Sequence, residues 1–131
     1  MATSIVRSFT IALAAALGTA AAHAESVIST DGLKASGTSV TVGSVTADKD
    51  GYIVVHRTDF TGTLPGPVVG HAPVKAGANA NVTVTLDKEA KPGTNLIVIL
   101  HEEGDGDTDF DEADPPAKAD GKVVQQTVTV E

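Results

Sequence analysis

The amino-acid sequence predicts an all-β fold, namely an antiparallel, immunoglobulin-like β-sandwich of about seven strands. Short runs rich in Val, Ile and Thr recur along the chain, and several alternate apolar and polar side chains, as half-buried strands do. Turn signals such as Asp-Gly and Pro-Gly separate these runs, and no stretch has the periodicity of an amphipathic helix. A small closed β-barrel is the alternative architecture.

The pattern within each run predicts how its strand is buried. The segment 81–86 alternates apolar and polar residues, so one of its faces should be buried. The segment 95–101 is apolar at nearly every position, which predicts a central strand that is covered on both faces. The segment 114–121 is rich in Ala, Pro and Lys and predicts a loop. Strands are expected at residues 26–29, 39–45, 51–56, 67–72, 81–86, 95–101 and 122–130.

The first 24 residues predict a secretory signal peptide. Arg7 supplies the positive charge, and the segment 9–22 is mostly apolar. A small-x-small pattern ends at Ala24, so cleavage there leaves one β-sandwich domain at residues 25–131. A transmembrane anchor is disfavoured because the apolar stretch is shorter than the roughly 20 residues that span a bilayer. We therefore expect a secreted or periplasmic protein with no membrane insertion after cleavage.

Composition and charge exclude several classes of function. The nine basic residues include Arg7, so eight remain after cleavage against 17 acidic residues. Nucleic acid is not an expected partner, because phosphate binding requires clustered Lys and Arg. The chain has no cysteine, which excludes disulfides, zinc-thiolate sites, iron–sulfur clusters and cysteine nucleophiles.

Five motifs occur in a fixed order along the chain. The first three are Asp-Gly-Tyr-Ile-Val-Val-His at 50–56, Pro-Val-Val-Gly-His at 67–71 and the segment 76–87. They are followed by Leu-Ile-Val-Ile-Leu-His at 96–101 and by an acidic segment with Asp109-Phe110 and Asp114-Pro115. This ordered set resembles a family of uncharacterised secreted and cell-surface domains, common in haloarchaea and also found in bacteria. The resemblance covers roughly residues 39–130. It implies a β-sandwich outside the cytoplasm and no activity. In that family the last histidine is often followed by a basic and an acidic residue, whereas Glu102 and Glu103 follow His101 here.

The segment 102–114 has the most distinctive chemistry. Eight of its 13 residues are carboxylates and none is basic, so it is either a solvated loop or a site for a hard cation. Calcium is the candidate cofactor, because it prefers oxygen ligands, whereas magnesium rarely uses an all-protein cage. An EF-hand loop is not expected, since Thr108 stands where the sharp turn requires glycine. The candidate calcium ligands are Glu103, Asp105, Asp107, Asp109, Asp111 and Asp114.

Two histidines form an alternative metal site. His56 and His101 each end an apolar strand, and with a carboxylate such as Glu102 they could bind Cu(II) or Zn(II). Signal cleavage before His23 would add a terminal amine and a third imidazole to this hypothesis. The competing interpretation is that both imidazoles make local hydrogen bonds at the edge of the core, as we expect for His71.

These observations predict an exported, non-catalytic binding or structural module that bears an acidic loop, which is a candidate calcium site. Its expected partner is a protein or a cell-surface component of undetermined identity. One alternative is a periplasmic copper-binding protein that uses His56 and His101. A hydrolase with an acid pair in the acidic segment is the least favoured alternative, because no nucleophile elbow or other local catalytic signature is present.

Overall fold

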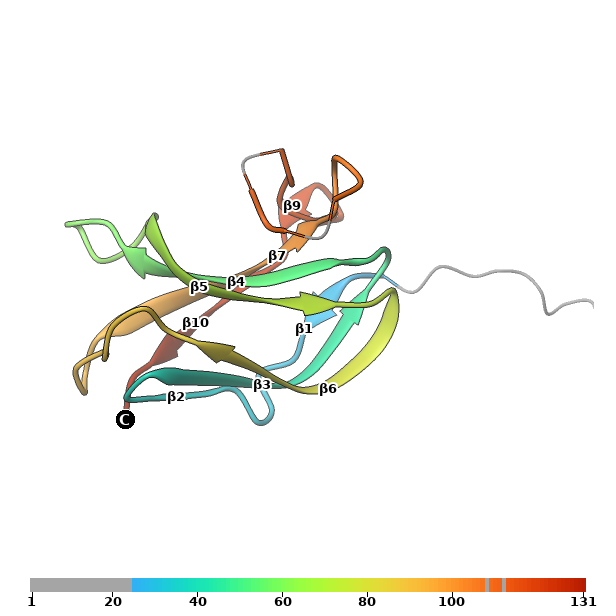
Figure 1. Cartoon of the computed structure of the whole chain (residues 1–131). Helices are drawn as coiled ribbons and strands as arrows, with labels where there is room; N and C mark the ends of the chain where they lie inside the picture. Colours follow the sequence, from blue (N-terminus) through green and yellow to red (C-terminus); the bar gives the residue numbers. More distant parts are fainter. Residues whose placement is uncertain (1–24, 108, 112) are drawn as a thin grey trace, which may run out of the picture.

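The computed structural model describes residues 25–107, 109–111 and 113–131. The predicted signal peptide at residues 1–24 lies outside the described residues. The described chain is all-β and forms two antiparallel sheets that face one another (Figure 1). The prediction of an antiparallel β-sandwich is confirmed. Within these residues no helix is long and apolar enough to cross a membrane.

The first sheet is built around β3 (Ser39–Ala47). On one side β3 pairs along nearly its whole length with β6 (Gly77–Thr85). On its other side it pairs with β1 (Val27–Ile28) near one end and with β2 (Lys34–Ser36) near the other. The short first strand was predicted, whereas β2 was not.

The second sheet has the order β10-β7-β4-β5, and all its pairs are antiparallel. Its central strands are β4 (Gly51–Thr58) and β7 (Asn95–Glu102). The outer strands are β5 (Pro65–Val74) and β10 (Gln125–Thr129). A separate hairpin, β8 (Lys118–Ala119) and β9 (Lys122–Val123), precedes β10. The predicted strand at 122–130 is therefore divided, and the predicted loop at 114–121 contains β8.

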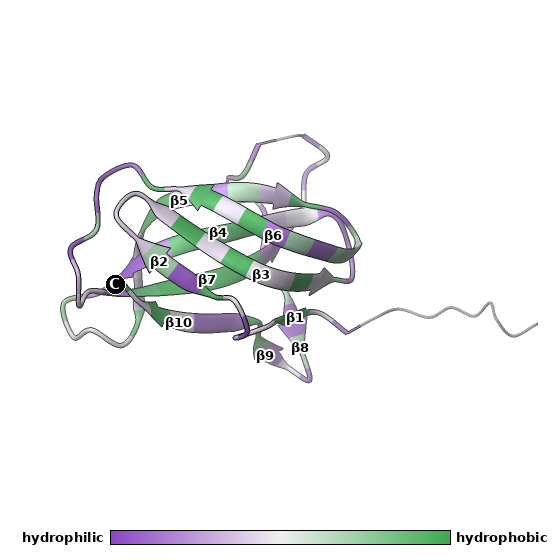
Figure 2. Cartoon of the chain, turned by 90° about the horizontal axis from the view of Figure 1, so that it is seen from below, coloured by the Kyte–Doolittle hydropathy of each residue, from purple (hydrophilic) through white to green (hydrophobic). Residues whose placement is uncertain are grey.

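Aliphatic side chains from both sheets fill the space between them, and the alternation of hydrophobic and hydrophilic positions along β3 and β6 is visible in Figure 2. The sheets meet only locally at their edges. Ala35 of β2 forms an isolated parallel bridge with Val130. On the other side the amide of Asp87 donates to the carbonyl of Val69 at 2.8 Å. These single contacts leave two distinct sheets, which favours the sandwich over the closed barrel.

A paired irregularity changes the buried face of β3 and β6 at the same point. In β3 the buried positions are Val40 and Val42 before Gly43, but Val45 and Ala47 after it. Asn81, in the middle of β6, has a positive φ of 53°. An added Cβ on Gly43 would clash with the carbonyl of Asp31, so this position requires glycine. The two strands change face together, which keeps their pairing register intact.

The outer face of the second sheet is also buried, and this feature positions the site. Val54 of β4 and Ile99 of β7 are opposite one another and have exposed fractions of 0% and 5%. Neither belongs to the core cluster between the sheets. The connection after β7 folds back over this face (Figure 1). We call residues 103–114 of that connection the acidic loop.

Candidate functional site: the acidic loop and the histidine pair

The acidic loop is closed at its base by backbone pairing. The amide of Glu102 donates to the carbonyl of Pro115 at 2.8 Å, and the amide of Ala117 donates to the carbonyl of Leu100 at 2.8 Å. The amide of Glu103 reaches the carbonyl of Asp50 at 3.0 Å, which ties the loop to the start of β4. The loop therefore projects from a fixed neck.

Asp114 organises the inside of the loop. Its side chain is buried, with an exposed fraction of 2%. Its Oδ1 accepts the amide of Gly104 at 2.8 Å, and its Oδ2 accepts the amide of Asp111 at 2.9 Å. These two bonds tie residues 104 and 111, on opposite sides of the loop, to the same buried side chain. An added Cβ on Gly104 would run into the carbonyl of Ala113, so the close approach across the neck requires glycine.

Glu103 joins the loop to the sheet. Its Oε1 accepts the hydroxyl of Tyr52 at 2.8 Å. Its Oε2 accepts the amides of Asp105 at 2.9 Å and Gly106 at 2.5 Å. Burial raises the pKa of Tyr52, and the bond to Glu103 raises it further, so the phenol stays protonated and donates.

The carboxylates of the loop meet in two groups that share Asp105. Within each group one oxygen from every member lies within 4.8 Å of the others. The pKa of Asp105 is raised: contacts with Glu103 and with the Asp107 amide lower it, but partial desolvation and the neighbouring carboxylates of Asp111 and Asp107 outweigh them. The first group is Glu103, Asp105 and Asp114, and the second is Asp105, Asp107 and Asp111.

The structure thus brings together five of the six predicted calcium ligands. The sixth, Asp109, is exposed and lies in neither group; its amide donates to the Asp107 carboxylate at 3.0 Å. Glu102 also lies outside both groups, and its carboxylate is 3.9 Å from the Lys49 ammonium.

Phe110 anchors the loop on the outer face of the second sheet. Its ring centroid lies 4.9 Å from that of His101, 5.5 Å from that of His71 and 5.9 Å from that of Tyr52. Neither Tyr52 nor Phe110 was expected from the sequence to belong to a site. The signal that could have found Tyr52 is the lack of alternation in β4, where five consecutive residues are buried.

The two candidate copper ligands lie next to each other beneath this anchor. The ring centroids of His56 and His101 are 6.1 Å apart, with an angle of 22° between the ring planes. The Nδ1 of His56 lies 2.9 Å from the carbonyl of Gly66, and the Nδ1 of His101 lies 2.8 Å from the carbonyl of Asp114. Burial lowers the pKa of His101, and the neighbouring His56 lowers it further. His71 is exposed.

A model for a domain of unknown function matches residues 26–131. The chain belongs to the family DUF7282. The resemblance inferred from the ordered motifs is thereby confirmed, and the match includes the whole acidic loop and both histidines of the pair. Comparisons of this DUF7282 chain with curated proteins and with solved structures gave no match.

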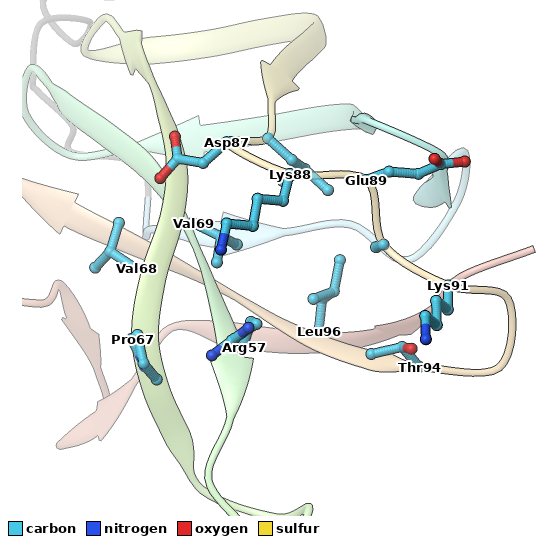
Figure 3. Close-up of a pocket in the computed structure, with 12 residues that line it drawn as sticks. Arg57, Pro67, Val68, Val69, Asp87, Lys88, Glu89, Lys91, Thr94 and Leu96 are labelled. Atoms are coloured by element: carbon cyan, nitrogen blue, oxygen red, sulfur yellow. The ribbon is translucent and has the colours of Figure 1, made fainter.

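The DUF7282 domain also has a hollow at the opposite end of the second sheet, where β7 begins and β4 ends (Figure 3). Its volume is about 410 Å³. Leu96 and Val69 contribute apolar surface, while the charged side chains on its rim have both signs. This mixture indicates no particular ligand chemistry. The charged lining residues are Arg57, Asp87, Lys88, Glu89 and Lys91.

Proposed function

We propose that this chain is an exported, non-catalytic module whose acidic loop binds calcium. The observation that carries the proposal is the convergence of five carboxylates into two groups that share Asp105. Export is proposed from the sequence of residues 1–24, and the absence of a recognisable catalytic constellation supports a binding or structural role.

The chemistry of the loop suits calcium better than other common cations. Ca²⁺ takes about six to eight oxygen ligands in variable geometry, and carboxylates with backbone carbonyls are its usual donors. The two groups contain only carboxylates, without the sulfur or nitrogen donors that select softer metals. Backbone amides already orient Glu103, Asp105 and Asp111, so less order has to be created when the ion binds.

Charge provides the driving force. The loop has no Lys or Arg, so its carboxylates repel each other until a cation or salt screens them. Partial desolvation raises the pKa of Asp105, and the neighbouring Asp111 and Asp107 carboxylates raise it further. Calcium affinity should therefore fall as the pH is lowered through the pKa of Asp105, because a proton then competes with the ion for the shared carboxylate.

Thermal unfolding of the metal-free chain with increasing calcium tests the proposal. An ion that binds only the native state at ten times its dissociation constant adds about 1.4 kcal/mol of stability, which is roughly 5–10 °C for a domain of this size. The shift should be lost in Asp105→Asn and kept in Asp109→Asn, which makes the same charge change in the same loop outside both groups. Equal shifts in the two variants, or no shift in the wild type, would contradict a calcium site here.

A further inference from the structure

We propose that His56 and His101 bind one Cu(I) ion through their Nε2 atoms. This site is separate from the calcium site, because neither histidine belongs to the two carboxylate groups.

The hydrogen bonds of both rings fix the same tautomer. In each, Nδ1 lies within hydrogen-bond distance of a backbone carbonyl, at 2.9 Å for His56 and 2.8 Å for His101. A carbonyl oxygen can only accept, so Nδ1 carries the proton and donates it. In the neutral ring Nε2 is then a free lone pair, which is the form that binds metals.

Both of these lone pairs are buried and have no protein partner. The Nε2 atoms of His56 and His101 are inaccessible to solvent and make no hydrogen bond within the part of the chain that the structure describes. His101 as a whole is only 8% exposed. A buried acceptor without a partner is destabilising, and native structures rarely leave one unsatisfied. Two such atoms on adjacent rings indicate a ligand that both share.

The spacing of the rings fits one shared ion. Metal–nitrogen bonds to histidine are about 2 Å long, which separates the ring centroids of two imidazoles on one ion by roughly 5–6.5 Å. The observed centroid separation is 6.1 Å. The backbone carbonyls of Gly66 and Asp114 take the place of the outer-shell acceptors that hold a ligating histidine in position.

Two nitrogen ligands suit Cu(I) better than Zn(II). Among the described residues, no set of three ligand atoms within 4.8 Å of one another includes either histidine. Zinc requires four ligands in structural sites and three in catalytic ones, whereas Cu(I) is stable with two nitrogen donors in a linear arrangement. Phe110 beside His101, with the buried Val54 and Ile99 two residues before the histidines in β4 and β7, supplies apolar surroundings, while Asp114 is the charged neighbour of His101. A low-dielectric site penalises a monovalent ion less than a divalent one.

The structure also changes the ligand set expected from the sequence. There, Glu102 was a candidate third ligand for Cu(II) or Zn(II). In the fold Glu102 follows His101 directly in β7, so the two side chains point to opposite faces, and Glu102 approaches Lys49 at 3.9 Å. Among the described residues, the site therefore consists of the two imidazoles.

Anaerobic titration of the full folded domain with Cu(I), in competition with a chromogenic Cu(I) chelator, tests the proposal. We expect one ion per chain and an X-ray absorption spectrum with two nitrogen neighbours at about 2 Å. Ag(I), which is not oxidised under these conditions, should bind with the same stoichiometry. His56→Ala should lower the Cu(I) affinity at least about a hundredfold, and the exposed His71→Ala should leave it unchanged.

Two further arms keep the result interpretable. If His56→Ala does not fold, ¹⁵N spectra of the wild type still provide a test. Cu(I) should shift the Nε2 resonances of His56 and His101, while both Nδ1 atoms stay protonated. Asp105→Asn should abolish the calcium shift and retain Cu(I), so failure of one site is distinguishable from failure of the other. Two results would overturn the proposal: Cu(I) binding that is unchanged in His56→Ala, or a chelator that removes all Cu(I) while the Nε2 resonances stay unshifted. Either result would favour a pair of histidines bridged by water.

Discussion

At the scale of single residues, Asp114 connects the two candidate sites. Its carboxylate accepts the amides of Gly104 and Asp111 and joins the first carboxylate group, while its carbonyl accepts the Nδ1–H of His101. A shift of this one residue would alter both the calcium ligands and the orientation of the imidazole. Its position as the last residue of the acidic segment gave no indication of this double role, because a backbone contact to a histidine 13 residues away has no sequence signature.

Burial of His101 predicts a specific loss of stability in acid. A pKa held below the ordinary value of about 6.5 means that the folded state binds a proton less readily than the unfolded chain. His101 therefore contributes stability above about pH 6.5, and that contribution is lost as the pH falls further. Among the described residues, the charged and titratable groups facing it are His56 and Asp114, and Tyr52 remains neutral.

Urea unfolding of the metal-free wild type and of His101→Gln between pH 7.5 and pH 5 measures this effect. Glutamine keeps a donor for the Asp114 carbonyl but does not titrate. The carboxylates affect both proteins alike, so their effect cancels when the unfolding free energy of His101→Gln is subtracted from that of the wild type. This difference should decrease as the pH is lowered. Parallel curves across the range would mean that the imidazole does not titrate differently in the two states.

At the scale of elements, the acidic loop acts as a cover for a sheet as well as a charged segment. The amide and side-chain contacts of its neck fix it above β4 and β7, and Phe110 packs against three rings on that face. The buried outer face of β4 and β7 depends on this cover. A change at the neck should therefore affect calcium binding and the protection of the sheet together.

Gly104→Ala is the change that tests this coupling. The new Cβ would meet the Ala113 carbonyl and open the neck. Gly106→Ala is the matched control: Gly106 has a φ of 84° and open space around its Cα, so alanine there only strains a turn, at roughly 1–2 kcal/mol. We expect Gly104→Ala to lose the calcium-dependent shift and to speed hydrogen exchange at the amides of Glu102 and Ala117. Equal behaviour of both variants would argue against a coupled neck.

Long strands with a clear burial pattern could be predicted from the sequence, whereas very short strands and distant side-chain contacts could not. The strand at 95–101 was identified correctly, as burial on both sides leaves a continuous apolar run that requires no knowledge of its neighbours. The short strands β2 and β8 were missed because two or three residues carry no measurable periodicity. The bond between Tyr52 and Glu103 joins residues 51 positions apart, and such contacts are determined by the tertiary fold alone.

At the scale of the whole molecule, negative charge is concentrated at one end of the sandwich. The acidic loop lies beyond the last residues of β7, whereas Arg57, Lys88 and Lys91 line the hollow at the other end. The core between the sheets is aliphatic and contains no disulfide, so stability rests on packing and on backbone pairing. A bound cation would offset the repulsion at the acidic end and add to that stability.

The beginning of the sandwich predicts where the mature chain starts. The Oγ of Ser26 accepts the amide of Asp48 at 3.0 Å, and Val27 pairs with Thr46, so the second and third residues of a chain that starts at Glu25 already contact the sandwich. Cleavage before Glu25 preserves all of them, and intact mass measurement of the exported chain should give residues 25–131. A start at His23 would instead add a terminal amine and an imidazole, and a second copper ion per chain would then bind at the N-terminus. More than one Cu(I) per chain, reduced to one in His23→Ala, would identify the chain that starts at His23. Retention of residues 1–24 would contradict the export proposal.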